Sequence, residues 1–205
     1  MNGYPGLAGE TGMKGRRFGF AMIAALTIAA TVGIVAIVSG NFDDTDWRIL
    51  GSVGAVALFS LTAMEGAALL RRDDPAAPLG GLGIIVSLLT LALSVALIWQ
   101  TGYDEDGTLD DWYRALSVGV TWSIALGHVS LLLSRRRESD GGVVTALVAT
   151  AIGFVVGIAT MLSIAMLRFD LDVSEGFWRA LAVMAILAVL ATILLPVTRR
   201  IQRRR

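Results

Sequence analysis

Residues 111–137 read DWYRALSVGVTWSIALGHVSLLLSRRR, and this stretch contains the pattern on which the whole chain is built. An acid, a Trp and an Arg lead into an apolar run, residues 115–133, which is followed by three consecutive arginines. At about 1.5 Å per residue, a helix over this run reaches nearly across a hydrocarbon core about 30 Å thick. The stretch therefore predicts a membrane-spanning helix with one acidic, aromatic end and one basic end.

The same pattern occurs twice more, in residues 42–72 and 169–200. The Trp and the first inner arginine are 24, 23 and 21 residues apart in the three copies, close to one membrane crossing each. We therefore predict three helical hairpins, at about 17–72, 79–137 and 143–200, that point the same way around a pseudo-threefold axis. Alternatively, any protein with an even number of spans shows alternating acidic and basic loops, but that leaves the shared Trp-Arg step unexplained.

The composition places the chain in a bilayer. It is 55% hydrophobic with a mean hydropathy of +0.71, too apolar for a soluble domain of 205 residues. Six apolar runs are long enough to span a membrane: 18–40, 49–70, 79–99, 115–133, 143–167 and 180–198. The predicted fold is an all-α integral membrane protein with one six-helix domain at 17–200, a disordered N-terminus at 1–16 and a basic tail at 201–205. The first run is predicted to be a retained signal anchor.

The charges give this protein a predicted orientation. The N-terminus, the second and fourth loops and the tail hold 13 basic residues against five acids, whereas the other three loops hold four against eleven. Because Lys and Arg resist translocation, both termini are expected in the cytoplasm. Aromatic residues gather at the predicted outer ends, where amphipathic rings suit the headgroup layer. The use of 16 Arg to one Lys suggests a high-GC bacterial genome, and hence the bacterial cytoplasmic (inner) membrane.

Two ionisable side chains, Glu65 and His128, lie inside the predicted spans, and they are the candidate proton or ion site. Glu65 lies six residues before Arg71 and His128 seven before Arg135, so both lie at a similar depth. The repeat makes the two positions equivalent, with an apolar residue near Ile193 in the third copy, and a pair sharing a proton could sense pH. The alternative is structural: Glu65 is protonated or reaches Arg71 or Arg72, and His128 binds a neighbouring helix.

The outer loops contain a candidate acidic ring of eleven carboxylates. Its members are Asp43, Asp44, Asp46, Asp104, Glu105, Asp106, Asp110, Asp111, Asp170, Asp172 and Glu175. Such a ring would concentrate cations at the mouth of a pore. Residues 104–111 are rich in oxygen ligands but lack the ligand order of an EF-hand, so no metal site is predicted. The arginines beside Trp are expected to reach the loop carboxylates or lipid phosphate.

The basic tail is expected to contact anionic lipid headgroups. The residues are Arg199, Arg200, Arg203, Arg204 and Arg205, and Pro196 just before them could kink or end the last helix. Gly153 and Gly157 have the spacing of close helix packing, more in keeping with an internal contact than a dimer seam. The expected partners are membrane lipids, with a second copy or another membrane protein left open and nucleic acid not expected.

Enzyme classes find little support in the sequence. It lacks the phosphate-binding, metalloprotease and serine-hydrolase motifs, and a single His cannot ligate a membrane haem on both sides. We therefore expect no catalysis and no cofactor, and a noncatalytic accessory, scaffold or stress-related membrane component. The alternative is a small cation channel or proton-coupled transporter that uses Glu65, His128 and the acidic ring.

Overall fold

The computed structural model describes residues 27, 31, 34–35, 43–72, 74–100, 108–137, 140–168 and 174–202. Within these residues, five helices are long and apolar enough to cross a membrane. They are α2 (Asp44–Leu70), α3 (Ala77–Trp99), α4 (Thr108–Ser134), α5 (Gly142–Leu167) and α6 (Glu175–Gln202). The last five predicted spans are thus confirmed as helices.

The first predicted span, 18–40, lies mostly outside the described residues, as do residues 1–16 and the end of the tail at 203–205. The four described positions in that span, 27, 31, 34 and 35, are helical. The pseudo-threefold relation of three hairpins stays a prediction, because the first hairpin is not described in full. Pro196 does not end the last helix, since α6 continues past it to Gln202.

Packing divides the chain into two units, residues 1–57 and 58–205. The first unit includes the start of α2, where two carboxylates form a reciprocal cap. The Asp43 side chain accepts the backbone N–H of Asp46 at 2.9 Å, and the Asp46 side chain accepts the backbone N–H of Asp43 at 3.3 Å. This pairing satisfies amide groups that the first helical turn leaves without a partner, and it places negative charge at the positive end of the helix dipole.

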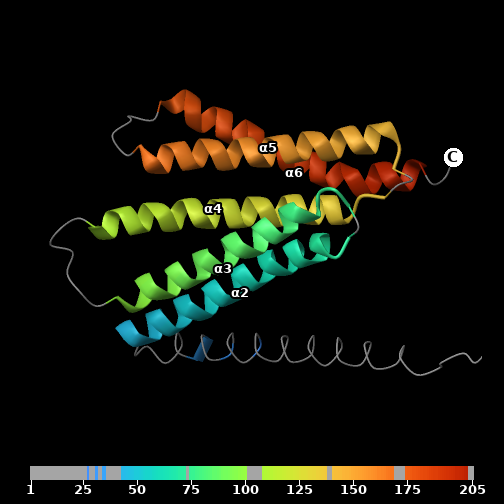
Figure 1. Ribbon diagram of the computed structural model, residues 1–205. Coiled ribbons are helices and arrows are strands. Elements are labelled where there is room, and N and C mark those ends of the chain that lie inside the picture. The colour runs from blue at the N-terminus through green and yellow to red at the C-terminus, as the bar shows by residue number, and fades with distance from the viewer. Residues whose placement is uncertain are drawn as a thin grey trace, which may run out of the picture. The chain divides into compact units, whose positions relative to one another are not determined.

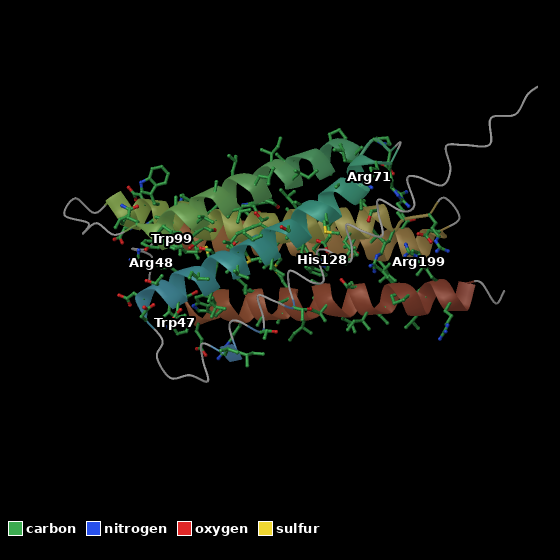
Figure 2. All side chains as sticks on the ribbon, turned by 90° about the horizontal axis from the view of Figure 1, so that it is seen from below. Trp47, Arg48, Arg71, Trp99, His128 and Arg199 are labelled. Atoms are coloured by element: carbon green, nitrogen blue, oxygen red, sulfur yellow. The ribbon has the colours of Figure 1, made fainter. Side chains whose placement is uncertain are left out.

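In the second unit, α3, α4, α5 and α6 run alternately in opposite directions (Figure 1). Helix α4 packs against α3 and α5, and α5 packs against α6. One end of this unit, the aromatic end, carries Trp99, Trp112, Tyr113 and Trp178. The opposite end, the arginine end, carries Arg71, Arg72, Arg135, Arg136, Arg137, Arg199 and Arg200. Figure 2 shows Trp99 at one end, Arg71 and Arg199 at the other, and His128 between them.

Small and hydroxyl-bearing residues line the seam between the second half of α2 and helices α3 and α4. The buried positions of α3 are spaced three and four residues apart: Gly80, Gly83, Ser87, Thr90, Ser94 and Leu97. Where α2 and α3 approach closely, a Cβ added to Gly66 would lie 2.6 Å from the backbone oxygen of Gly80, and one added to Gly80 would lie still closer to the backbone oxygen of Gly66. The backbones of α2 and α3 therefore touch, which is how helices associate where lipid removes the hydrophobic drive.

A second cluster joins α4, α5 and α6 near the arginine end. Its buried members are Leu132, Val144, Val148, Ala151, Ala191 and Leu195. The predicted internal contact through Gly153 is wrong, because Gly153 lies on the exposed face of α5 with nothing within 4 Å of an added Cβ. Alanines on the opposite face make the contact instead, and of the two glycines only Gly157 meets a neighbouring helix, at the tip of the Met184 side chain.

The described residues expose many large aliphatic side chains and bury several hydroxyls, which differs from a water-soluble protein. Ser87, Ser123 and Ser130 are fully buried, whereas Leu89 and Ile186 are 67% and 66% exposed. In water, large aliphatic side chains gather inside and hydroxyls lie outside. The observed order suits a multi-pass membrane protein whose helices face lipid and meet one another through small polar residues.

Candidate functional site

Glu65 lies in the seam, where α2 faces α4. Its carboxylate rests against Gly127, since a Cβ added there would lie 2.7 Å from Glu65 Oε2 and 3.2 Å from Thr62 Cβ. The side chain is half-buried, and its electrostatic partner is Arg135 at the end of α4. The sequence predicted that Glu65 could reach Arg71 or Arg72. Arg72 instead donates to backbone oxygens at the end of α4. Gly127 provides the space that the carboxylate occupies.

His128 belongs to a different interface, between α4 and α6. Its Nε2 atom lies 3.3 Å from the hydroxyl of Thr192. Because that hydroxyl has one hydrogen and can donate it to the backbone oxygen of Ala188 at 2.8 Å, we assign to His128 the tautomer in which Nε2–H donates to Thr192. The expectation that His128 binds a neighbouring helix is confirmed, and its partner is the residue next to Ile193.

Glu65 on α2 therefore lies beside the same turn of α4 that carries His128, but the two side chains have separate partners. Gly127, which Glu65 contacts, and His128 are consecutive residues, and consecutive side chains on a helix point about 100° apart. No hydrogen bond joins Glu65 to His128, both of which belong to the described part of the chain. The equivalence of the two positions in a repeat stays a prediction, and helix rotation directs the two side chains toward different neighbours.

Four polar contacts between helices share one arrangement, in which a donor crosses to a hydroxyl that in turn donates to its own helix. Ser123 donates to Thr90 at 3.3 Å, and Thr90 donates to the backbone oxygen of Val86 at 2.7 Å. Trp122 Nε1 donates to Ser163 at 3.0 Å, and Ser163 donates to its own helix at 2.7 Å. We call these contacts hydroxyl relays.

The other two hydroxyl relays are His128 with Thr192 and Ser87 with Thr62, whose oxygens lie 2.8 Å apart. Helix α4 is the hub, because it donates to α3, α5 and α6. Thr62, Ser87 and Ser163 were not predicted as interhelical contacts from the sequence. The sequence shows hydroxyls at three- and four-residue spacing. That spacing does not distinguish interhelical contacts, because Ser and Thr elsewhere in the helices bond only to their own backbone.

The acidic ends of α4 and α6 carry local ion pairs. Arg114 pairs with Asp111 at 3.3 Å, and Arg179 pairs with Glu175 at 2.6 Å, so both of these arginines reach a carboxylate as expected. Asp104, Glu105, Asp106, Asp170 and Asp172 lie outside the described residues, and the acidic ring stays a prediction. In the part of the chain that is described, no three His, Cys, Asp or Glu residues gather as a metal site.

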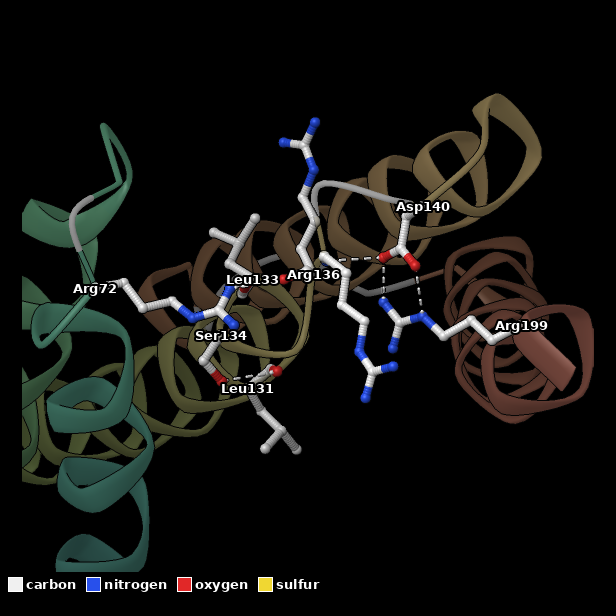
Figure 3. A network of polar contacts seen from close by, with 8 residues as sticks. Arg72, Leu131, Leu133, Ser134, Arg136, Asp140 and Arg199 are labelled. Carbon is white, nitrogen blue, oxygen red and sulfur yellow. Dashed lines mark hydrogen bonds and ion pairs between the residues drawn. The ribbon is translucent and has the colours of Figure 1, made fainter. Parts of the chain in front are cut away.

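The arginine end is tied together by two long-range contacts (Figure 3). Arg72 donates to the backbone oxygens of Leu133 at 3.3 Å and Arg136 at 2.7 Å, and so satisfies carbonyls at the end of α4. Arg199 forms a two-pronged pair with Asp140, Nη2 to Oδ2 at 2.7 Å and Nε to Oδ1 at 3.2 Å. The Asp140 side chain is only 5% exposed. Arg199, expected to contact lipid, thus has a carboxylate partner within the protein.

A groove separates α4 from α6, and α5 forms its floor. Its apolar part, the apolar groove, has a volume of about 430 Å³ and runs along α4 from Val120 to His128. Its lining residues are mostly aliphatic, with His128, Thr121 and Thr192 as the polar exceptions. Ile193 and Val189 at its rim are 60% and 57% exposed, so the groove opens to the surroundings of the helices.

The apolar groove continues toward the arginine end into a second cavity of about 360 Å³, the basic pocket. Thr192 lines both cavities and marks their junction. The charged lining residues of the basic pocket are Arg135, Arg137, Arg199 and Arg200. Asp140 balances one of these charges, and the basic pocket keeps a net positive charge.

No known protein family, curated protein or solved structure matches this chain. Its activity must therefore be inferred from its own side chains and their arrangement.

Proposed function

We propose that this chain is a noncatalytic multi-pass protein of the bacterial cytoplasmic membrane, where it serves as an accessory or scaffold component. In this proposal the arginine end and both termini lie in the cytoplasm and the aromatic end faces outward. The proposal is supported above all by the closed seam around Glu65.

The seam is closed by contacts that leave little room for an ion or a hydrated proton path. Gly66 and Gly80 bring two backbones into contact, and an added Cβ on Gly119 would lie 2.6 Å from the Thr90 hydroxyl. Four of the hydroxyls in the seam, those of Thr62, Ser87, Thr90 and Ser123, are used in hydroxyl relays, Ser94 donates to its own helix, and the buried Ser130 hydroxyl has no hydrogen-bond partner among the described residues. A transport site needs polar groups that converge on a passage. In this seam the hydroxyls of the relays bond to neighbouring helices instead, and these contacts hold the helices rigidly against one another.

The proposed orientation rests on the arginine end. Short loops rich in Lys and Arg stay on the cytoplasmic side during insertion. The exposed tryptophans at the other end, Trp112 and Trp178, suit the opposite headgroup layer.

Proton flux into vesicles tests the proposal against its alternative, a channel or proton-coupled transporter. The purified protein would be reconstituted into liposomes that contain a pH-sensitive dye, and an outward pH step imposed with and without a membrane potential. A scaffold leaves the rate of internal pH change equal to that of protein-free liposomes. A faster rate that Glu65→Gln or His128→Ala abolishes would establish transport and overturn the proposal.

A further inference from the structure

The apolar groove and the basic pocket together have the polarity of a phospholipid. Aliphatic side chains line the first, a polar junction at His128 and Thr192 follows, and the arginines of the basic pocket come last. A phospholipid presents an acyl chain, an ester region and a phosphate in the same order.

The apolar groove also has a fitting length. Along α4 it spans nine residues from Val120 to His128, or about 12 Å by helical rise. Half of a hydrocarbon core about 30 Å thick is about 15 Å, which is the depth that one leaflet's acyl chains occupy. Its volume of about 430 Å³ lies within the range of small-ligand sites. The apolar groove is therefore long enough for one acyl chain along most of a leaflet.

The polar junction is reinforced by Pro196, which lines the basic pocket. Proline has no N–H to donate to the carbonyl four residues earlier, so the backbone oxygen of Thr192 loses its usual helical partner. That oxygen and the neighbouring imidazole put polar atoms at the level where an acyl chain meets its ester.

The groove could be filled by a phospholipid or by another helix, and the positive charge of the basic pocket favours the phospholipid. The N-terminal apolar run of this chain is preceded by Lys14, Arg16 and Arg17, and a second copy would bring its own arginine end. Like charges at close range oppose both arrangements. A phosphate brings the opposite charge and accepts the donors that guanidinium groups present.

We propose that the groove between α4 and α6 binds one anionic phospholipid, with an acyl chain in the apolar groove and the phosphate in the basic pocket. In the orientation proposed above, the arginine end places this phospholipid in the cytoplasmic leaflet. The binding of the phospholipid does not depend on that orientation. Lipid binding, measured in detergent, and the proposed scaffold function, measured by flux in liposomes, can therefore be disproved independently of each other.

Lipid binding can be measured on the whole chain in detergent by native mass spectrometry and by thermal stability. The probes are dioleoyl phosphatidylglycerol, dioleoyl phosphatidylcholine with the same chains, and inorganic phosphate. We expect one phosphatidylglycerol to be retained and to raise Tm, with phosphatidylcholine binding at least about tenfold more weakly. Equal retention of both lipids, or an equal Tm rise with inorganic phosphate, would overturn the proposal.

Variants locate the site. Arg137→Gln with Arg200→Gln removes two charges of the basic pocket, and Ala185→Leu fills the apolar groove. Each is expected to weaken phosphatidylglycerol binding by about tenfold or more. Matched controls are Arg71→Gln, at the same end but outside the basic pocket, and Ala182→Leu, an exposed position of α6 outside the apolar groove.

Size-exclusion chromatography reports whether each variant is folded. If the double variant does not fold, Arg200→Gln alone provides the test with an expected loss of severalfold. Unchanged affinity in the folded groove variants, or an equal loss in the two controls, contradicts a site between α4 and α6.

Discussion

At the scale of single residues, this chain is held together by hydroxyls that serve two helices at once. A Ser or Thr in a span can satisfy itself by donating to its own helix, and here four such hydroxyls also accept a donor from a neighbour. Each contact is worth little, since interhelical hydrogen bonds in membranes average about 0.6 kcal/mol. These contacts instead fix how two helices are rotated against each other, because a donor and a hydroxyl meet at only one relative rotation.

The contact between His128 and Thr192 should show energetic coupling. In a double-mutant cycle with His128→Leu and Thr192→Val, the predicted interaction energy is about 0.6 kcal/mol, measured by reversible unfolding in mixed micelles. Thr160→Val is the control partner, because the exposed Thr160 bonds only to its own helix. Additive effects of His128→Leu and Thr192→Val would mean that the hydroxyl relay contributes nothing to stability.

The contact between α2 and α3 should not tolerate a methyl group. Gly80→Ala places a Cβ against backbone atoms of α2, which cannot yield as a side chain can, and is predicted to cost about 2 kcal/mol. Gly153→Ala is the matched control, since open space surrounds that position and alanine is the better helix former by up to about 1 kcal/mol. Unfolding free energies that fall equally for both variants would contradict the close approach.

At the scale of helices, the arginine end joins elements that are far apart in sequence. Arg72 follows α2 and satisfies carbonyls at the end of α4. Asp140 precedes α5 and holds Arg199 near the end of α6, while it also accepts the backbone N–H of Arg137. Helix ends leave backbone groups without partners, and these side chains supply them where apolar packing gives way to charged loops.

The pair of Asp140 and Arg199 is predicted to stabilise the second unit. Asp140→Asn should lower the free energy of unfolding by about 2 kcal/mol, the range for hydrogen bonds to charged groups. Glu175→Gln removes a similar pair whose side chains are 74% and 79% exposed, and its effect should stay within about 0.5 kcal/mol. Chemical unfolding of the two variants checks the difference, and equal effects would show that burial of Asp140 does not matter.

The helices were predictable from sequence, but their facing sides were not. Apolar runs bounded by charges locate α2 to α6, because length and hydropathy decide whether a helix can span lipid. Residues such as Ser87 and Thr90 could not be assigned to a seam, since every face of these helices is apolar enough for lipid. Glu65 and His128 could be recognised as ionisable residues within apolar runs, but their partners depend on helix rotation, which hydropathy does not encode.

At the scale of the whole chain, the helices α2, α4 and α6 each have a polarity along their length that was visible in the sequence. Acids and tryptophans lie at one end and arginines at the other, and large aliphatic side chains cover the outward faces of the second unit. Such helices are stable together only where lipid surrounds them, because in water that apolar surface would drive association. The account as a whole therefore depends on the helices crossing a bilayer with the arginine end in the cytoplasm.

Cysteine accessibility tests that claim most directly, because the chain contains no cysteine of its own. Pro75→Cys lies between α2 and α3 near the arginine end, and Ser174→Cys lies just before α6 at the other, both at exposed positions. With a membrane-impermeant maleimide on intact spheroplasts, we predict that Ser174→Cys is labelled and that Pro75→Cys is labelled only after lysis. Labelling of Pro75→Cys in intact spheroplasts, or equal labelling of both positions, would contradict the account.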